Sequence, residues 1–293
     1  MSLQKKATMI ASICALSLTI IKFIIGIFSG SIAVLSSAMD SMMDFIVSVF
    51  NFLAVKKSAQ KPNEEYNFGY SKIEALMGFL EGSMIIGVAI FILYQSINKI
   101  YNKEIINDLN LSIYVMVFSI IVTFFLVLFL TFVAKKTKSL IVESDCLHYK
   151  SDLLSNFLTL VALIIIYFTN FYIIDAIFGL VISAYISFSA FEIIKKSLQF
   201  LMDKAIDDDK VEYVKEVIKS HPEVKSFHYL KTRKTPNMNY ISVHLVLCPI
   251  ISLYDAHKIG DQIENSIKEK FKDENFDIQI HLDPYDDSKN ERH

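Results

Sequence analysis

The chain has 293 residues, of which 53% are hydrophobic and only 20% are charged. This composition excludes a disordered protein and disfavours an ordinary soluble domain. The formal net charge of -2 leaves no broad basic field, so nucleic acid is a poor candidate partner. The odd number and wide spacing of Cys14, Cys146 and Cys248 indicate neither a disulfide framework nor a CxxC metal pair.

The charged residues are distributed unevenly along the chain. Residues 1–202 contain 13 acidic and 15 basic residues, whereas residues 203–293 contain 18 acidic and 14 basic residues in less than half the length. This difference predicts a transmembrane domain over 1–202 and a cytoplasmic domain over 203–285. The polar segment 286–293 is expected to be a flexible tail.

Six apolar segments are long enough to cross a bilayer, which requires about 20 largely apolar residues. The runs 109–134 and 153–174 contain no charged residue. The helical pattern before the second run continues back to Val142, so the fifth span is expected to begin there. The predicted transmembrane helices are 8–28, 32–55, 73–98, 109–134, 142–168 and 173–198.

The orientation of the predicted bundle follows from its lysines, because cytoplasmic loops carry an excess of Lys and Arg. Lysine clusters occur before the first span, after the second and fourth spans and at the end of the sixth, at Lys5–Lys6, Lys56–Lys57, Lys135–Lys136 and Lys195–Lys196. All of these fall on one side of the bundle. Both termini are therefore expected in the cytoplasm.

The remaining part of the chain alternates between helical and strand patterns. Helices are predicted over about 208–220 and 253–271, with strands over 224–230, 239–248 and 276–282. In the second strand Ile241, Val243 and Leu245 share one face, and His244 lies on the other. The fold class is therefore a six-helix transmembrane bundle followed by a small α+β domain of one sheet and two helices.

Two predicted spans carry paired ionisable residues, which are costly in a membrane and usually functional. Asp40 and Asp44 are four residues apart, as are His148 and Asp152, so each pair lies on one helix face. Two helices with two ligands each can form a four-ligand site for a zinc-like or cadmium-like ion. The other carboxylates within spans, Glu74, Glu81 and Glu192, are expected to form interhelical or interfacial hydrogen bonds.

Histidines are concentrated in the charge-rich part of the chain. His244 lies on the polar face of its strand, and His281 and Asp283 share the polar face of the last strand. His228 lies on the first strand and His257 on a helix that must pack nearby. These residues predict a second metal site.

The segments Ala38–Asp44 and Leu147–Asp152 resemble the paired signatures of the cation diffusion facilitator family, most closely its bacterial zinc and ferrous-iron efflux members. The resemblance covers almost the whole chain. It implies a homodimeric metal/proton antiporter of the bacterial inner membrane, whose last domain has a metallochaperone-like fold.

The resemblance also implies roles for particular residues. It assigns to the transport site Asp40, Asp44, His148 and Asp152. It assigns to a cytoplasmic binuclear zinc site His228, His244, His257, His281 and Asp283. It further implies that Lys72 and Asp203 form a charge interlock at the dimer's cytoplasmic hinge.

One part of the chain departs from the family pattern. Similar proteins place an Asp and two His in the loop between the second and third spans, where this chain has Asn63, Tyr66 and Tyr70. Asn and Tyr are poor zinc ligands, so a third metal site is not expected in this loop.

The predicted function is export of zinc-like ions from the cytoplasm in exchange for protons, without enzymatic activity. Cd²⁺ and Fe²⁺ are alternative substrates, and the sequence does not rank Zn, Cd, Fe(II) and Co or give the number of protons. One alternative is an intramembrane metal-dependent hydrolase. It is disfavoured because the chain lacks HExxH and because four protein ligands leave a metal no open position. The other alternative is a membrane-anchored metal sensor.

Overall fold

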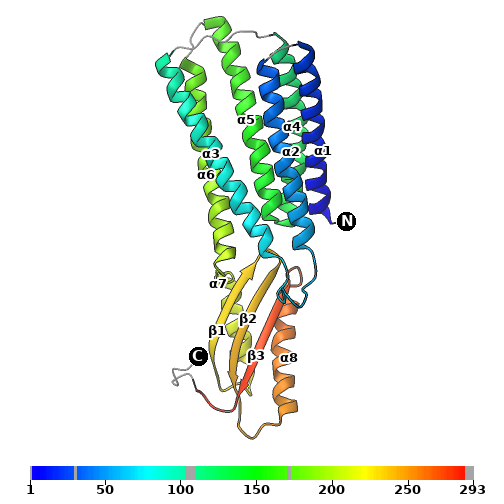
Figure 1. Cartoon of the computed structure of the whole chain (residues 1–293). Coiled ribbons are helices and arrows are strands. Elements are labelled where there is room, and N and C mark those ends of the chain that lie inside the picture. The colour runs from blue at the N-terminus through cyan, green and yellow to red at the C-terminus, as the bar shows by residue number, and fades with distance from the viewer. Residues whose placement is uncertain (1, 30–31, 103–109, 170–172, 288–293) are drawn as a thin grey trace. The chain divides into compact units, whose positions relative to one another are not determined.

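The structure is a computed structural model, shown in Figure 1, and it describes residues 2–29, 32–102, 110–169 and 173–287. The chain divides into two compact units, Met1–Leu198 and Gln199–His293, and each is described by itself.

The first unit is built from long helices connected by short segments (Figure 1). Each helix covers most of a predicted span and is longer than the prediction at one or both ends. The helices are α1 (Leu3–Ser29), α2 (Ile32–Ser58), α3 (Lys72–Asn102), α4 (Asn110–Thr137), α5 (Leu140–Thr169) and α6 (Ile173–Leu201).

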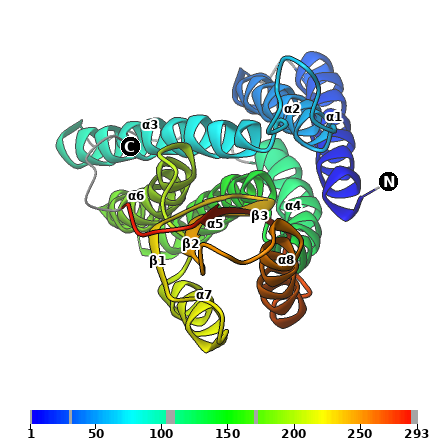
Figure 2. The ribbon, with the colours of Figure 1, turned by 90° about the horizontal axis from the view of Figure 1, so that it is seen from below.

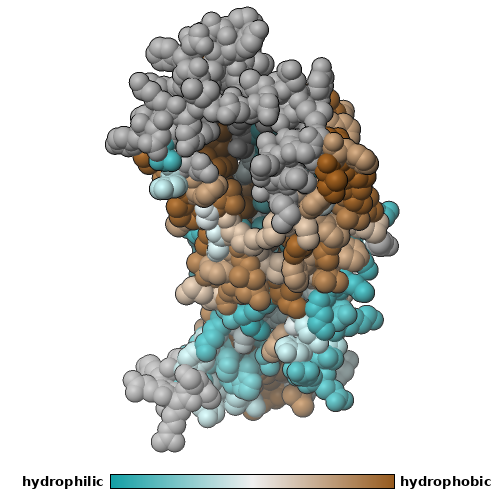
Figure 3. Space-filling model, turned by 45° about the horizontal axis from the view of Figure 1, so that its top comes forward, coloured by the Kyte–Doolittle hydropathy of each residue, from teal (hydrophilic) through white to brown (hydrophobic). Residues whose placement is uncertain are grey.

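Four of these helices, α1, α3, α4 and α6, contain a described stretch long and apolar enough to cross a membrane. The other two, α2 and α5, carry the ionisable residues of the predicted transport site. Large apolar side chains such as Phe91, Phe125 and Phe188 are exposed on the helices, and Figure 3 shows a mainly hydrophobic surface over the described part of the bundle. Such a surface suits contact with lipid.

Small residues allow the helices to pack closely. Ala7 and Ala11 of α1 are fully buried against Leu130 and Val133 of α4. On the other side of the unit α3 packs beside α6 (Figures 1 and 2). There a Cβ atom added to Gly82 would lie only 2.9 Å from Ile194 Cγ1, so the absence of a side chain at Gly82 permits this close approach.

The second unit contains α7 (Asp208–Ser220), β1 (Ser226–Thr235), β2 (Met238–Val246), α8 (Leu253–Lys270) and β3 (Phe276–Asp283). The strand order is β1-β2-β3. β1 pairs with β2 in antiparallel orientation, whereas β2 and β3 are parallel and are connected through α8. This arrangement agrees with the predicted order of helices and strands.

The core of this unit lies between the sheet and the two helices. The alternation predicted for β2 is confirmed, because Ile241, Val243 and Leu245 are at most 2% exposed. They pack against α7 and against α8, which contributes Ile263 and Ile267. The opposite face of β2 is therefore free to carry polar side chains, including His244.

Candidate metal sites

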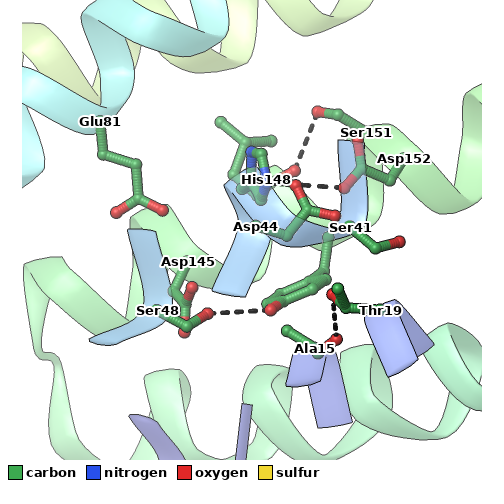
Figure 4. Close-up of polar contacts among 12 residues, drawn as sticks. Ala15, Thr19, Ser41, Asp44, Ser48, Glu81, Asp145, His148, Ser151 and Asp152 are labelled. Carbon is green, nitrogen blue, oxygen red and sulfur yellow. Dashed lines mark hydrogen bonds and ion pairs between the residues drawn. The ribbon is translucent and has the colours of Figure 1, made fainter. Parts of the chain in front are cut away.

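The first candidate site lies where α2 meets α5. His148 Nε2 is 3.0 Å from Asp44 Oδ1 and 3.6 Å from Asp152 Oδ2. The two α5 residues are four apart and share a helix face, and Asp44 reaches them from α2. Ligand atoms of these three residues all lie within 4.8 Å of one another, and Figure 4 shows the side chains gathered.

This triad can bind a divalent cation through one imidazole nitrogen and two carboxylates. The side chains are 24%, 18% and 35% exposed for Asp44, His148 and Asp152, so the triad is accessible rather than sealed in the core. The fourth predicted ligand, Asp40, lies in α2, but its side chain is outside the described residues. Its role remains a prediction.

Polar contacts continue along the same two helices. One turn beyond Asp44, the hydroxyl of Ser48 lies 2.9 Å from that of Tyr149. One further turn along, Asn51 Nδ2 donates to Asp145 Oδ1 at 3.3 Å and to Glu81 Oε2 of α3 at 3.2 Å. Glu81 Oε2 also accepts a hydrogen bond from Ser144.

We call Asn51, Glu81 and Asp145 the Asn51 cluster. The interhelical hydrogen bonds predicted for Glu81 are confirmed, and Glu74 accepts one from Ser139. The sequence prediction overlooked Asn51 because an uncharged amide does not stand out in an apolar segment. Its position seven residues after Asp44, on the same helix face, was the available signal.

The second candidate site lies across the sheet. Strand register places His228 of β1 opposite His244 of β2, and His244 opposite His281 of β3. Side chains at directly paired positions have Cβ atoms about 4.5–5.5 Å apart. Three histidines from three strands therefore form a row on one face of the sheet.

Asp283 holds part of this row together. Its carboxylate lies 2.9 Å from His244 Nδ1, 3.1 Å from His281 Nε2 and 3.4 Å from His228 Nε2. Ligand atoms of His228, His244 and Asp283 all lie within 4.8 Å of one another. We call these three residues the sheet triad.

The sheet triad fits a zinc ion. His228 is only 8% exposed, yet neither of its ring nitrogens has a hydrogen-bond partner in the described structure. A buried imidazole that faces a carboxylate without forming a hydrogen bond of good geometry leaves room for a metal that both groups could bind. Imidazole nitrogen and carboxylate oxygen are both ordinary zinc ligands.

Two acidic residues near this triad were not predicted. Asp287 Oδ1 lies 3.0 Å from His228 Nε2, and Asp286 Oδ1 lies 3.6 Å from His228 Nδ1. Both belong to segment 286–293, which was expected to be a flexible tail. Residues 288–293 of that segment lie outside the described residues. A pair of acids three residues after Asp283 was the signal in the sequence.

The remaining predicted ligands are less closely associated with the sheet triad. The His281 ring lies 4.5 Å from the His244 ring but is 65% exposed. His257 is 74% exposed on α8, where its nearest described carboxylate is Asp261 at 3.7 Å. The structure does not gather His257 with the other four residues, and its role as a ligand remains a prediction.

The loop between α2 and α3 is held by its own side chains. Asn63 Nδ2 donates to the Tyr70 hydroxyl at 3.0 Å, and Asn63 Oδ1 accepts from the Tyr66 backbone at 2.7 Å. The rings of Tyr66 and Tyr70 are 4.9 Å apart. No group of three metal-ligating residues is found in the described loop.

The predicted interlock residues lie in different units. Lys72 is the first residue of α3. Asp203 has a positive φ of 54° and lies 3.4 Å from Arg233 in the second unit. The pairing of Lys72 with Asp203 remains a prediction.

Comparison with known proteins assigns both units to described families. Residues 8–202 match the cation efflux transmembrane domain, and residues 206–285 match the cytoplasmic domain of cation efflux proteins. The cation-efflux pump FieF of Serratia proteamaculans is 34% identical over 282 residues, covering 96% of this chain and 93% of that protein. FieF of Yersinia enterocolitica is 33% identical over 291 residues, covering 99% and 96%.

Proposed function

Because this chain belongs to the cation diffusion facilitator family, we propose that it exports zinc-like divalent ions from the cytoplasm in exchange for protons. Members of the family are cation efflux transporters, not enzymes. The hydrolase alternative is therefore dropped. The identity of the ion and the coupling to protons are the parts that we propose.

The observation that carries the proposal is the position of His148 Nε2 between two carboxylates from different helices. Asp44 of α2 lies 3.0 Å from this atom and Asp152 of α5 lies 3.6 Å from it. A site shared by α2 and α5 can change its access when the helices move relative to each other. Transporters commonly bind cargo at such interhelical sites near mid-membrane.

The same geometry supports exchange of metal for protons. A carboxylate must be deprotonated and an imidazole neutral to bind a metal, so loading the site displaces protons. The His148 Nε2 atom that would bind the cargo is also the atom that can carry a proton toward Asp44. Cargo and proton therefore compete for one atom.

The donor set favours zinc among divalent ions. With Asp40 as fourth ligand, the proposed transport site has three carboxylates and one imidazole. Imidazole suits Zn²⁺ and similar ions, whereas hard ions such as Mn²⁺ and Mg²⁺ prefer oxygen alone. Cd²⁺ and Fe²⁺ are the alternative substrates.

The proposed assembly is a homodimer in the bacterial inner membrane. All of α1 to α6 would span the bilayer, with both termini in the cytoplasm as the lysine distribution indicates. The sheet triad, with His257 and His281, would hold zinc in the cytoplasmic unit. Zinc there would cross-link the three strands and stabilise the fold by binding the native state.

Uptake by sealed proteoliposomes tests the proposal. The protein would be reconstituted, and initial uptake of Zn²⁺, Cd²⁺, Fe²⁺, Co²⁺ and Mn²⁺ measured with and without an imposed pH gradient. We expect Zn²⁺ uptake that increases when protons can flow in the opposite direction. Binding without flux would instead favour the membrane-anchored sensor, and flux indifferent to the pH gradient would contradict antiport.

A further inference from the structure

The Asn51 cluster takes no part in the transport site described above. Its three members come from three helices and are almost completely buried, with exposed fractions of 0% for Asn51, 2% for Glu81 and 0% for Asp145. In Figure 4 Glu81 extends from α3 toward the part of α5 that carries Asp145. The carboxylates of Glu81 and Asp145 are therefore buried in the same region between the helices.

The Asn51 cluster has fewer hydrogen-bond donors than acceptor oxygens. The donors are Asn51 Nδ2, which serves one oxygen of each carboxylate, and the Ser144 hydroxyl. Three buried oxygens are left without a partner in the described structure, namely Asn51 Oδ1, Glu81 Oε1 and Asp145 Oδ2. Because Asn51 Oδ1 is an amide oxygen, the amide as well as the two carboxylates lacks a hydrogen-bond donor.

A positive charge in direct contact is also missing, because His148 acts on Glu81 and Asp145 only from beyond ion-pair distance. Among the described residues no Lys, Arg or His lies within ion-pair distance of Glu81 or Asp145, whereas His148 supplies that partner for Asp44. Uncompensated carboxylates are costly in a protein interior, and more so within a membrane. A divalent cation would neutralise both carboxylates and bind oxygens that now lack a donor.

The spacing suits an ion. Asn51 Nδ2 is 3.2 Å from Glu81 Oε2 and 3.3 Å from Asp145 Oδ1. Oxygens bound to one metal at about 2.1 Å are separated by about 3.0 to 3.4 Å. A half-turn of the amide exchanges Nδ2 for Oδ1, which would place the amide oxygen at such a separation from one oxygen of each carboxylate.

We propose that Asn51, Glu81 and Asp145 form a second divalent-cation site, made of oxygen ligands alone. In the empty site the Asn51 amide nitrogen donates to both carboxylates. In the occupied site the amide turns and its oxygen binds the ion. An all-oxygen site favours hard and borderline ions such as Mn²⁺ and Fe²⁺.

The location gives this site a role on the path of the cargo. Asn51 is about 10 Å along α2 from Asp44 at 1.5 Å per residue, on the side of Lys56 and Lys57. Those lysines mark the end of α2 proposed to face the cytoplasm. An ion that enters from the cytoplasm would therefore reach this site before it reaches the transport triad. This role rests on the proposed function, whereas binding of the ion does not.

Binding of Mn²⁺ to the full-length protein tests the proposal. The transport triad would be disabled by Asp44→Asn, and the sheet triad by His244→Ala with Asp283→Asn. Bound Mn²⁺ would be measured from the loss of the free-ion electron paramagnetic resonance signal. We expect this background protein to retain one Mn²⁺ per chain, and Glu81→Gln to weaken that binding at least tenfold. Glu74→Gln, which changes another buried carboxylate of α3, should leave it unchanged.

A background protein that binds no Mn²⁺, or that binds it equally well with Glu81→Gln, would overturn the proposal. If the multiple variant does not fold, Glu81→Gln alone should reduce the number of Mn²⁺ ions bound per otherwise unchanged chain by one. An equal number would overturn the proposal as well. Mn²⁺ binding that depends on Glu81, in a protein without metal flux, would refute the transport function and leave the site standing.

Discussion

The side-chain hydroxyls of Ser48 in α2 and Tyr149 in α5 lie 2.9 Å apart, and both residues are buried. Along α2, Ser48 lies between Asp44, which contacts His148, and Asn51, which contacts Asp145. Three polar contacts therefore link α2 to α5 and define the register of the two helices. The ligands of the proposed transport site depend on this register, because they come from both helices.

The Ser48–Tyr149 contact should stabilise the pairing of α2 with α5. Tyr149→Phe leaves the Ser48 hydroxyl buried without this partner, which we expect to cost about 1 kcal/mol. Thermal unfolding of the purified protein would measure the loss. The matched double variant with Ser48→Ala should lose less than the sum of the two single variants, and strictly additive losses would show that the hydroxyls do not interact.

His148 should determine the selectivity of transport. His148→Asp makes the proposed ligand set all-oxygen, so transport of Zn²⁺ and Cd²⁺ should weaken relative to Mn²⁺. Initial uptake into vesicles would give the Zn²⁺-to-Mn²⁺ ratio for both proteins, and we expect a decrease of about tenfold, equivalent to about 1.4 kcal/mol. The same ratio in both proteins would mean that His148 does not select the ion.

The second unit should bind zinc when expressed alone, because it has a hydrophobic core of its own. Zinc at 100 times its dissociation constant should stabilise a fragment of residues 205–287 by about 2.7 kcal/mol. Melting temperature with and without zinc measures this effect. Replacing His244 and His281 together should remove most of the gain and Asp287→Asn should reduce it, whereas His257→Ala tests whether the exposed His257 side chain also binds the ion.

Melting that does not respond to zinc would count against the site in this unit. An equal loss of the zinc effect in His257→Ala would show instead that His257 joins the ligands. Within this unit His257 does not lie with the sheet triad, although the sequence predicts that it is a ligand. The His257→Ala variant decides between these two possibilities.

The stability of the second unit should decline in acid partly through Asp207. Lys234 donates a hydrogen bond to its carboxylate at 2.6 Å and lowers the pKa of Asp207 below the usual 3.8. A lowered pKa in the folded state means that the stabilisation is present above pH 3.8 and is lost as the pH falls through the folded value.

Asp207→Asn should therefore lower the melting temperature of the fragment at pH 6, and the difference should vanish well below pH 3.8. We expect less than about 1 kcal/mol, because the pair is partly exposed and screened by solvent. Asp208→Asn, at the exposed neighbouring position, is the control. A difference that stays constant from pH 6 to pH 3 would exclude ionisation of Asp207 as the cause.

Much of the fold could be predicted from periodicity. The alternation of Ile241, Val243 and Leu245 predicted the buried face of β2, and this is confirmed. Spacing of four residues brought His148 and Asp152 to one face of α5. Such local patterns are determined by the geometry of a single helix or strand.

Contacts between distant elements could not be predicted in the same way. The row of His228, His244 and His281 depends on strand register, which no single strand contains. The approach of Asp287 to His228 could not be predicted either, because the polar composition of segment 286–293 does not show whether one of its residues contacts the sheet. The contacts of Asn51 with Glu81 and Asp145 could not be predicted either, because the three residues lie on three different helices.

We propose that the triad of Asp44, His148 and Asp152 binds the exported ion and exchanges it for protons. The most direct test is metal-driven proton release from proteoliposomes, measured with a pH-sensitive dye for the unchanged protein, Asp44→Ala and Asp152→Ala. We predict that each variant loses proton release and Zn²⁺ uptake while remaining folded, because an ion in this site loses one of its charged ligands. Unchanged proton release and uptake in both variants would contradict the claim.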